Sequence, residues 1–111
     1  MTVYLHDSQG VWIAFRSDLT SRDLFNPDGD WIGWFPWGDD DAVTPEGDYL
    51  GTVRGDRLFA RADAPYRGRP GYPGAPAYPG TVPYPGAASY TGLPDGCEDV
   101  AGALLWPRVA S

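Results

Sequence analysis

The stretch "FNPDGDWIGWF" (residues 25–35) decides the fold, because it has the pattern of a complete β-hairpin. Its centre, Asn26 to Gly29, is a strong turn signal: proline presets φ, and glycine accepts a positive φ at the end of the turn. Beyond the turn, apolar residues alternate at the spacing of a strand. We therefore expect two antiparallel strands joined at residues 26–29.

The same unit occurs three times. "LHDSQGVWIAF" (5–15) and "VTPEGDYLGTV" (43–53) also have a turn ending in glycine, then one residue, an aromatic, Ile or Leu, and Ala or Gly. A weaker fourth copy begins at "DRLFARADAP" (56–65), which lacks the Gly-x-Trp half. The sequence therefore predicts an all-β fold of three or four hairpins, with no helix in residues 1–64.

Strand alternation places the aromatic residue of each unit on one face and the aliphatic residue on the other. The aromatic set is Trp12, Trp31 and Tyr49. Two positions further along the same face lies Ala or Gly, which leaves a hollow that a ring from a neighbouring repeat can fill. Burial in the core is one interpretation of the aromatic set, and stacking against a ligand is the other.

A second repeat occupies residues 65–94. Tyrosine occurs there every six residues, and glycine follows each tyrosine by two positions. The tyrosines are Tyr66, Tyr72, Tyr78, Tyr84 and Tyr90. Three residues per turn is the polyproline II period, so small residues, tyrosines and prolines separate onto three edges. We expect an ordered polyproline II segment with its small edge toward protein; a disordered spacer is the alternative.

The end of the chain, "LPDGCEDVAGALLWPRVAS", is apolar enough from Val100 to Trp106 to return to the core. We therefore expect three parts in one structural domain. They are a β-hairpin repeat domain (1–64), a Tyr/Pro/Gly polyproline II segment (65–94) and a C-terminal anchoring segment (95–111).

Composition excludes several function classes. The net charge is −7 and every basic residue is arginine, so the chain lacks the basic stripe of a nucleic-acid-binding protein. The absence of lysine excludes a Walker-type phosphate loop and Schiff-base chemistry. The sequence shows no signal-peptide pattern, and its longest apolar run is too short to cross a bilayer. We expect a soluble, cytoplasmic protein that binds neither nucleic acid nor membrane.

Residues of catalytic type do not form a catalytic pattern. Cys97 and His6 each occur once, which argues against a disulfide, a cysteine metal cluster or a histidine-built site. Asp7 adjoins His6, but adjacent side chains point oppositely in a strand and no nucleophile accompanies them. The run of aspartates at 39–41 lacks calcium-loop spacing and is interpreted as a solvated loop. We expect no enzymatic activity, no cofactor and no metal.

Taken in order, these motifs resemble the bacterial proteins called 4-fold β-flower proteins. The matching parts are "HDSQGVWIAF", "NPDGDWIGWF" and "PEGDYLGTV", then the period-three tract at 65–94, then "LPDGCEDV", and they cover almost the whole chain. The resemblance implies hairpin petals around a fourfold or pseudo-fourfold axis, and implies no activity. Tyr-Pro-Gly stands here where Lys-Pro-Ile-like triplets are expected, which changes the exposed chemistry but not the period.

Two functional hypotheses follow. The first is a non-enzymatic structural or interaction module, a β scaffold that docks a polyproline II segment from its own chain or from a second copy in a homo-oligomer. The second is a small-ligand or glycan-binding module that uses surface tryptophans as stacking platforms. The candidate binding residues are Trp12, Trp31, Trp34, Trp37, Tyr49, Tyr72, Tyr78 and Tyr84. Burial of the tryptophans distinguishes the two.

Overall fold

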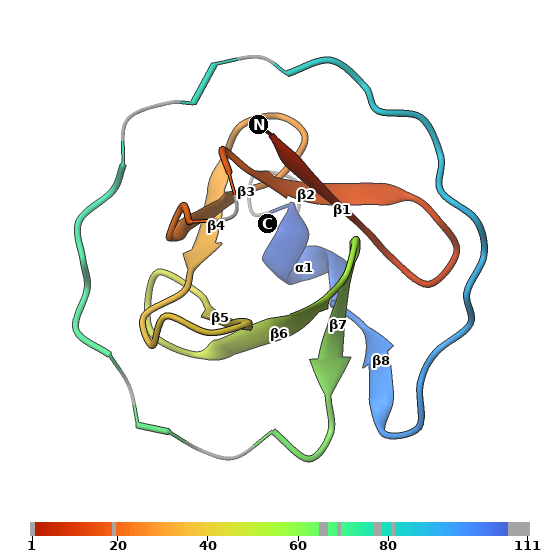
Figure 1. Cartoon of the computed structure of the whole chain (residues 1–111). Helices are drawn as coiled ribbons and strands as arrows, with labels where there is room; N and C mark the ends of the chain where they lie inside the picture. Colours follow the sequence, from red (N-terminus) through yellow and green to blue (C-terminus); the bar gives the residue numbers. More distant parts are fainter. Residues whose placement is uncertain are drawn as a thin grey trace.

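The computed structural model describes residues 2–18, 20–64, 67–68, 70–76, 79–80 and 82–106. Within these residues the chain is all-β, as predicted: seven strands form a closed barrel and an eighth pairs with the seventh (Figure 1). The strands are β1 (Val3–His6), β2 (Trp12–Arg16), β3 (Asp23–Phe25), β4 (Trp31–Trp34), β5 (Asp41–Val43), β6 (Tyr49–Arg54), β7 (Arg57–Arg61) and β8 (Cys97–Asp99). One helical turn, α1 (Gly102–Leu105), follows β8.

Three hairpins of the same construction make up most of the barrel: β1–β2, β3–β4 and β5–β6. Each has a register shift beside its turn, and such bulges increase the local strand twist. At the second tip, the Asn26 N–H donates to the Asp30 carbonyl and the Gly29 N–H to the Asn26 carbonyl, both at 2.9 Å. Gly29 and Gly47 have φ of 85° and 97°. The predicted hairpins and both positive φ values are confirmed.

The hollow beside each aromatic residue is filled differently from the prediction. A Cβ at Gly33 would collide with the Val43 carbonyl oxygen and lie 2.8 Å from a Leu50 methyl. At Gly51 the nearest atom is the Phe59 carbonyl oxygen, at 3.1 Å from the Cβ position. Neighbouring backbone and aliphatic side chains occupy these spaces, because adjacent strands approach more closely where the side chain is missing.

The barrel closes where β1 pairs in parallel with β7, through His6 and Arg57. β7 also pairs with β8, and together they form a fourth, antiparallel hairpin. Its two strands are separated by residues 62–96. The weak fourth repeat at 56–65 therefore contains the first strand of a hairpin whose second strand comes after the Tyr/Pro/Gly tract.

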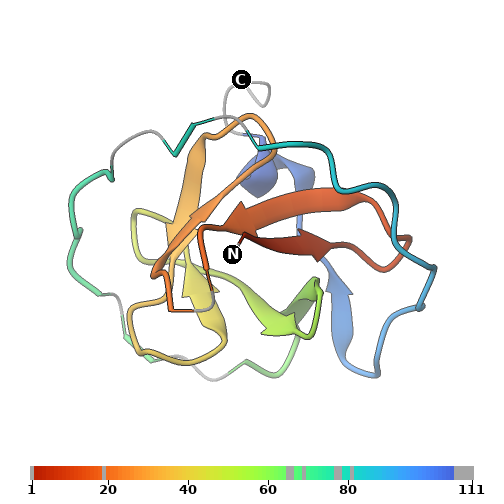
Figure 2. The same cartoon turned by 45° about the horizontal axis from the view of Figure 1, so that its top comes forward.

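Residues 65–94, which we call the belt, are inserted between the strands of this fourth hairpin. The described residues of the belt run around the outside of the barrel (Figures 1 and 2). The return of the chain to the barrel at β8 brings the following segment, which includes α1, to the interior.

The belt is not a continuous polyproline II helix, and that prediction is wrong. Such a helix has φ near −75° throughout, whereas five belt glycines have φ between 69° and 90°. They are Gly68, Gly74, Gly80, Gly86 and Gly92. A positive φ at every sixth residue is incompatible with one unbroken left-handed helix.

The glycines on the small edge of the belt do not pack their Cβ positions against the barrel either. A Cβ placed at Gly74, Gly80 or Gly86 would meet no atom within 4 Å. The expected close approach of this edge to other backbone or aromatic faces is therefore wrong at these Cβ positions, although the Gly86 carbonyl oxygen lies 3.3 Å from His6 Nε2 in β1. The physical reason is the glycine φ, because a period of three residues keeps one edge aligned only while every φ has the same sign.

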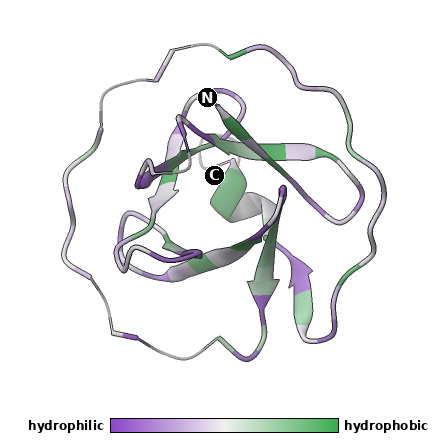
Figure 3. Cartoon of the chain, viewed as in Figure 1, coloured by the Kyte–Doolittle hydropathy of each residue, from purple (hydrophilic) through white to green (hydrophobic). Residues whose placement is uncertain are grey.

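The barrel interior is filled by aliphatic side chains and by Phe35, and the green segments of Figure 3 lie mainly on the strands and on α1. Val100 and Leu105 are buried in the same cluster. The Asn26 side-chain amide donates to the Leu105 carbonyl at 2.8 Å, which fixes α1 near the second hairpin tip. The predicted return of the chain to the core is confirmed for Val100 and Leu105. Within the described residues, no helix has the length and apolarity to cross a membrane.

Candidate functional site: the barrel surface beneath the belt

β2 is buried on both faces because the belt covers its outer side. All five residues of β2 are buried, and Trp12 on the outer side is only 9% exposed. The Trp12 ring centroid lies 5.6 Å from that of Tyr4 and 5.9 Å from that of the belt residue Tyr84. The indole N–H donates to the Ala14 carbonyl at 2.9 Å. Trp12 is therefore a core residue with its polar group satisfied.

Trp31 occupies the equivalent position in the second hairpin and also contacts a belt tyrosine. Its ring centroid lies 5.7 Å from that of Tyr72, in an edge-on arrangement. The indole nitrogens of Trp31 and Trp34 are buried without a hydrogen-bond partner among the described residues. Tyr72 and Tyr84 are 66% and 68% exposed, so each places one side of its ring on the barrel and leaves the remainder in solvent.

Trp34 lies on the same surface and faces the belt across an open space. The Arg22 guanidinium carbon is 5.8 Å from the Trp34 ring centroid. A cavity of about 370 Å³ separates this pair from belt residues 73–76. Trp34 therefore lies near the belt without a ring-to-ring contact among the described residues.

At the start of the belt, Arg67 makes a compact set of polar contacts. Its Nη1 donates to Asp39 Oδ2 at 2.6 Å and to Asp41 Oδ2 at 3.1 Å. Its guanidinium carbon is 4.1 Å from the Trp37 ring centroid, which is cation–π geometry. Partial burial raises the pKa of Asp39, but the Arg67 hydrogen bond and charge outweigh it, so that pKa lies below its ordinary value. The Asp39 hydrogen bond in turn raises the pKa of Arg67.

The end of the belt is fixed by backbone hydrogen bonds to the first hairpin tip. The Ala88 N–H donates to the Gly10 carbonyl, and the Thr91 N–H to the Ser8 carbonyl, both at 2.9 Å. A Cβ at Gly10 would collide with the Ala88 carbonyl. Ser8 also donates from its N–H and its hydroxyl to the Asp99 carboxylate, at 2.9 and 2.8 Å, which joins this tip to β8.

Tyr49, the third member of the aromatic set, stabilises the barrel instead of stacking on a belt ring. Its hydroxyl accepts the Arg61 N–H at 3.0 Å and lies 2.7 Å from the Thr52 hydroxyl. The Thr52 hydroxyl donates to Asp41 Oδ1, also at 2.7 Å. Tyr49 therefore positions Thr52, and Thr52 in turn holds Asp41, which accepts a hydrogen bond from Arg67.

The structure brings most predicted site residues to one surface. Trp12, Trp31, Tyr72 and Tyr84 meet in pairs, and Trp37 contacts the belt through Arg67. Tyr78 lies outside the described residues.

Sequence reasoning missed Arg67, its two carboxylates and the Ser8–Gly10 anchor. The interpretation of residues 39–41 as a solvated loop is wrong for Asp41, whose side chain is 13% exposed. The signal that was available was the pair of arginines, Arg67 and Arg69, at the start of an otherwise uncharged aromatic tract, in a chain with an excess of acids.

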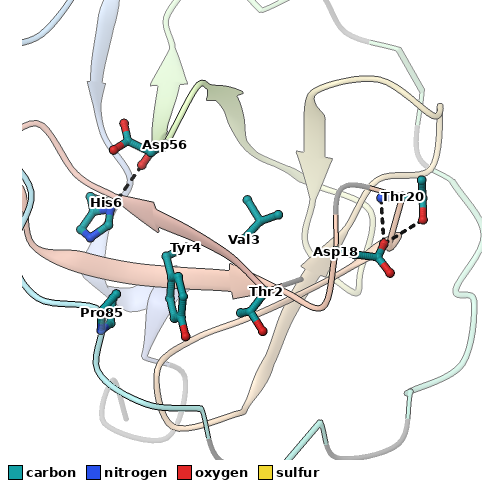
Figure 4. Close-up of a pocket in the computed structure, with 8 residues that line it drawn as sticks. All are labelled: Thr2, Val3, Tyr4, His6, Asp18, Thr20, Asp56 and Pro85. Atoms are coloured by element: carbon teal, nitrogen blue, oxygen red, sulfur yellow. Dashed lines mark hydrogen bonds between the residues drawn. The ribbon is translucent and has the colours of Figure 1, made fainter.

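Another cavity has none of the predicted tryptophans among the described residues of its wall. It measures about 620 Å³ and is bounded by β1, the loop after β2, Asp56 and the belt residue Pro85 (Figure 4). Val3, Tyr4 and Pro85 make much of its wall apolar. Asp18 at its edge accepts the Thr20 N–H at 2.8 Å and the Thr20 hydroxyl at 2.7 Å, and the latter bond lowers the pKa of Asp18. The Asp18 carboxylate therefore makes its hydrogen bonds within its own loop.

In comparisons with known proteins, no family model matches the chain, and neither a curated protein nor a solved structure matches it.

Proposed function

We propose that the protein is a non-enzymatic structural or interaction module whose barrel docks its own belt. The observation that carries this proposal is the matched spacing of two repeats. Trp12 and Trp31 are equivalent residues of successive hairpins, and Tyr84 and Tyr72, two periods apart in the belt, contact them in turn. In a spacer without a docking role, we would not expect the spacing of the tyrosines to match the spacing of the hairpins.

Proline favours this role because it restricts the belt before docking. Between its glycines the belt is rich in proline, and we propose polyproline II conformation for these short stretches. Such stretches lose little conformational entropy when they bind aromatic surfaces. Four hairpins, three of them built alike, also support a pseudo-fourfold arrangement of the kind that the β-flower resemblance implies.

The alternative, ligand stacking on tryptophans, has less support. Trp12 is buried, the Trp31 ring contacts Tyr72, and one face of Trp37 carries Arg67. A glycan would have to displace the belt to reach these rings.

Amide exchange combined with mass measurement tests the proposal. We expect the Ala88 and Thr91 amides to be protected, because both donate to the first hairpin tip. Light scattering on the same sample should give the 12.0 kDa monomer, since the proposal has the belt dock on the barrel of its own chain. Random-coil exchange at both amides, with the hairpin amides still protected, would overturn the proposal. A protected dimer or larger assembly would show docking between copies instead.

A further inference from the structure

The contacts of Arg67 have the chemistry of a guanidinium-binding site. A planar cation lies over an indole ring, and one of its nitrogens donates to two carboxylates. Guanidinium groups suit such sites because they are planar, weakly hydrated and able to stack while donating at the edge. The cation comes from the belt, whereas Trp37, Asp39 and Asp41 all belong to the barrel and its loops.

The barrel holds both carboxylates in place without help from the belt. Asp39 Oδ1 accepts the Asp41 N–H at 3.0 Å, and Asp41 Oδ1 accepts the Thr52 hydroxyl at 2.7 Å. The Thr52 hydroxyl is positioned in turn by Tyr49. Each carboxylate therefore uses Oδ1 within the barrel and presents Oδ2 to the guanidinium. A site whose ligand-facing atoms are already oriented binds at a lower entropic cost.

The residue after the arginine, Gly68, lies at the edge of this site. Gly68 has a φ of 85°, and a Cβ there would meet open space, so glycine serves the backbone conformation and not a close contact. A cavity of about 150 Å³ lies beside Arg67 and Gly68, with Trp37, Asp41 and Tyr49 among its walls. The site thus has room next to its present occupant.

We propose that Trp37, Asp39 and Asp41 form a recognition site for an arginine followed by glycine, with Arg67–Gly68 as the ligand bound in cis. This inference rests on the proposed docking function and names the chemistry of one docking point. Emptied of Arg67, the site accepts the same dipeptide from solution. It discriminates against lysine, because a compact ammonium stacks less well and is more strongly hydrated.

The test uses the full chain carrying Arg67→Ala and two probes, N-acetyl-Arg-Gly-amide and N-acetyl-Lys-Gly-amide. We expect the arginine probe to shift the Trp37 indole NMR signal in a saturable manner, and the lysine probe to bind at least about fivefold more weakly. The unchanged chain should bind neither, since Arg67 fills the site. Addition of Asp41→Asn to Arg67→Ala should abolish binding of the arginine probe.

Equal binding of both probes, or no binding to an Arg67→Ala chain with protected hairpin amides, would overturn the inference. If Arg67→Ala does not fold, Arg67→Lys carries the test, and failure of the arginine probe to displace the substituted lysine side chain would also overturn it. The Ala88 and Thr91 amides separate this result from the proposed function. If they stay protected while the probes fail, belt docking stands and the guanidinium site does not.

Discussion

At the scale of single residues, glycine has two distinct roles that the sequence reveals unequally. At the hairpin tips, proline two positions before glycine made the positive φ of Gly29 and Gly47 predictable. At Gly33 the reason is space, since a side chain would meet the Val43 carbonyl and Leu50. That role depends on how neighbouring hairpins pack, which no local pattern encodes.

Alanine at the hairpin tips tests the first role. Gly29→Ala and Gly47→Ala should each lower the free energy of unfolding by about 1 kcal/mol, because a Cβ disfavours positive φ. Gly71→Ala is the control: Gly71 does not have a positive φ, and its Cβ position is open. Thermal unfolding of the three variants measures the effect. Melting temperatures for both tip variants equal to that of Gly71→Ala would contradict the role given to φ.

At the scale of elements, the hairpins were predictable and the orientation of the belt was not. Turn residues and strand alternation are local signals, and all three hairpins followed them. The period of six identified the tyrosines, two of which contact the barrel. Which belt edge faces inward depends on the sign of φ at the glycines, and composition does not determine that sign because glycine adopts either.

Truncation of the belt tyrosines tests their contacts. Tyr84→Ala should lower the free energy of unfolding by about 1 kcal/mol, the typical value of an aromatic pair. It should also expose Trp12, which shifts the indole fluorescence to longer wavelength. Tyr90→Ala is the matched control, because Tyr90 is 74% exposed and makes no ring contact among the described residues. Equal losses for both variants would show that the Trp12–Tyr84 pair contributes nothing.

The belt glycines give a second prediction for this element. The space beyond the Cβ position of Gly74 is open, so leucine there should not push the belt off the barrel. Gly74→Ala and Gly74→Leu should therefore cost about the same, since both meet the same backbone strain at a φ of 88°. D-alanine at this position, introduced by chemical synthesis, should be tolerated. A clearly larger loss of thermal stability for leucine would restore the steric explanation.

At the scale of the whole molecule, the closure of the barrel and the position of the belt could not be predicted from the sequence. The barrel closes through the His6–Arg57 pairing between its first and seventh strands, and such a non-local pairing has no sequence signature. The insertion of the belt between β7 and β8 could not be recognised from the sequence, because it separates the two strands of the fourth hairpin. The belt then links hairpins that are distant in sequence, through Arg67 at one end and the Ser8–Gly10 tip at the other.

The Arg67 end of this link should weaken in acid. The pKa of Asp39 is lowered in the folded state because the Arg67 hydrogen bond and charge outweigh partial burial, which acts in the opposite direction. A carboxyl with a lowered folded pKa contributes stability that is complete above its unfolded pKa, about 3.9, and is lost as the pH falls through the folded value. Arg67 stays charged throughout this range.

The difference in melting temperature between the unchanged chain and Arg67→Ala isolates this contribution, because most other carboxyls titrate alike in both. We expect the difference to be constant from about pH 7 to pH 5 and to shrink as the pH falls below about 4. Added salt at pH 7 should reduce it as well, since the pair is solvent-accessible. Arg54→Ala removes the same charge from an exposed position at the end of β6. The difference in melting temperature between this variant and the unchanged chain should change much less with pH. If the Arg67→Ala difference persists undiminished in acid, stacking on Trp37 holds Arg67 in place and the carboxylates do not.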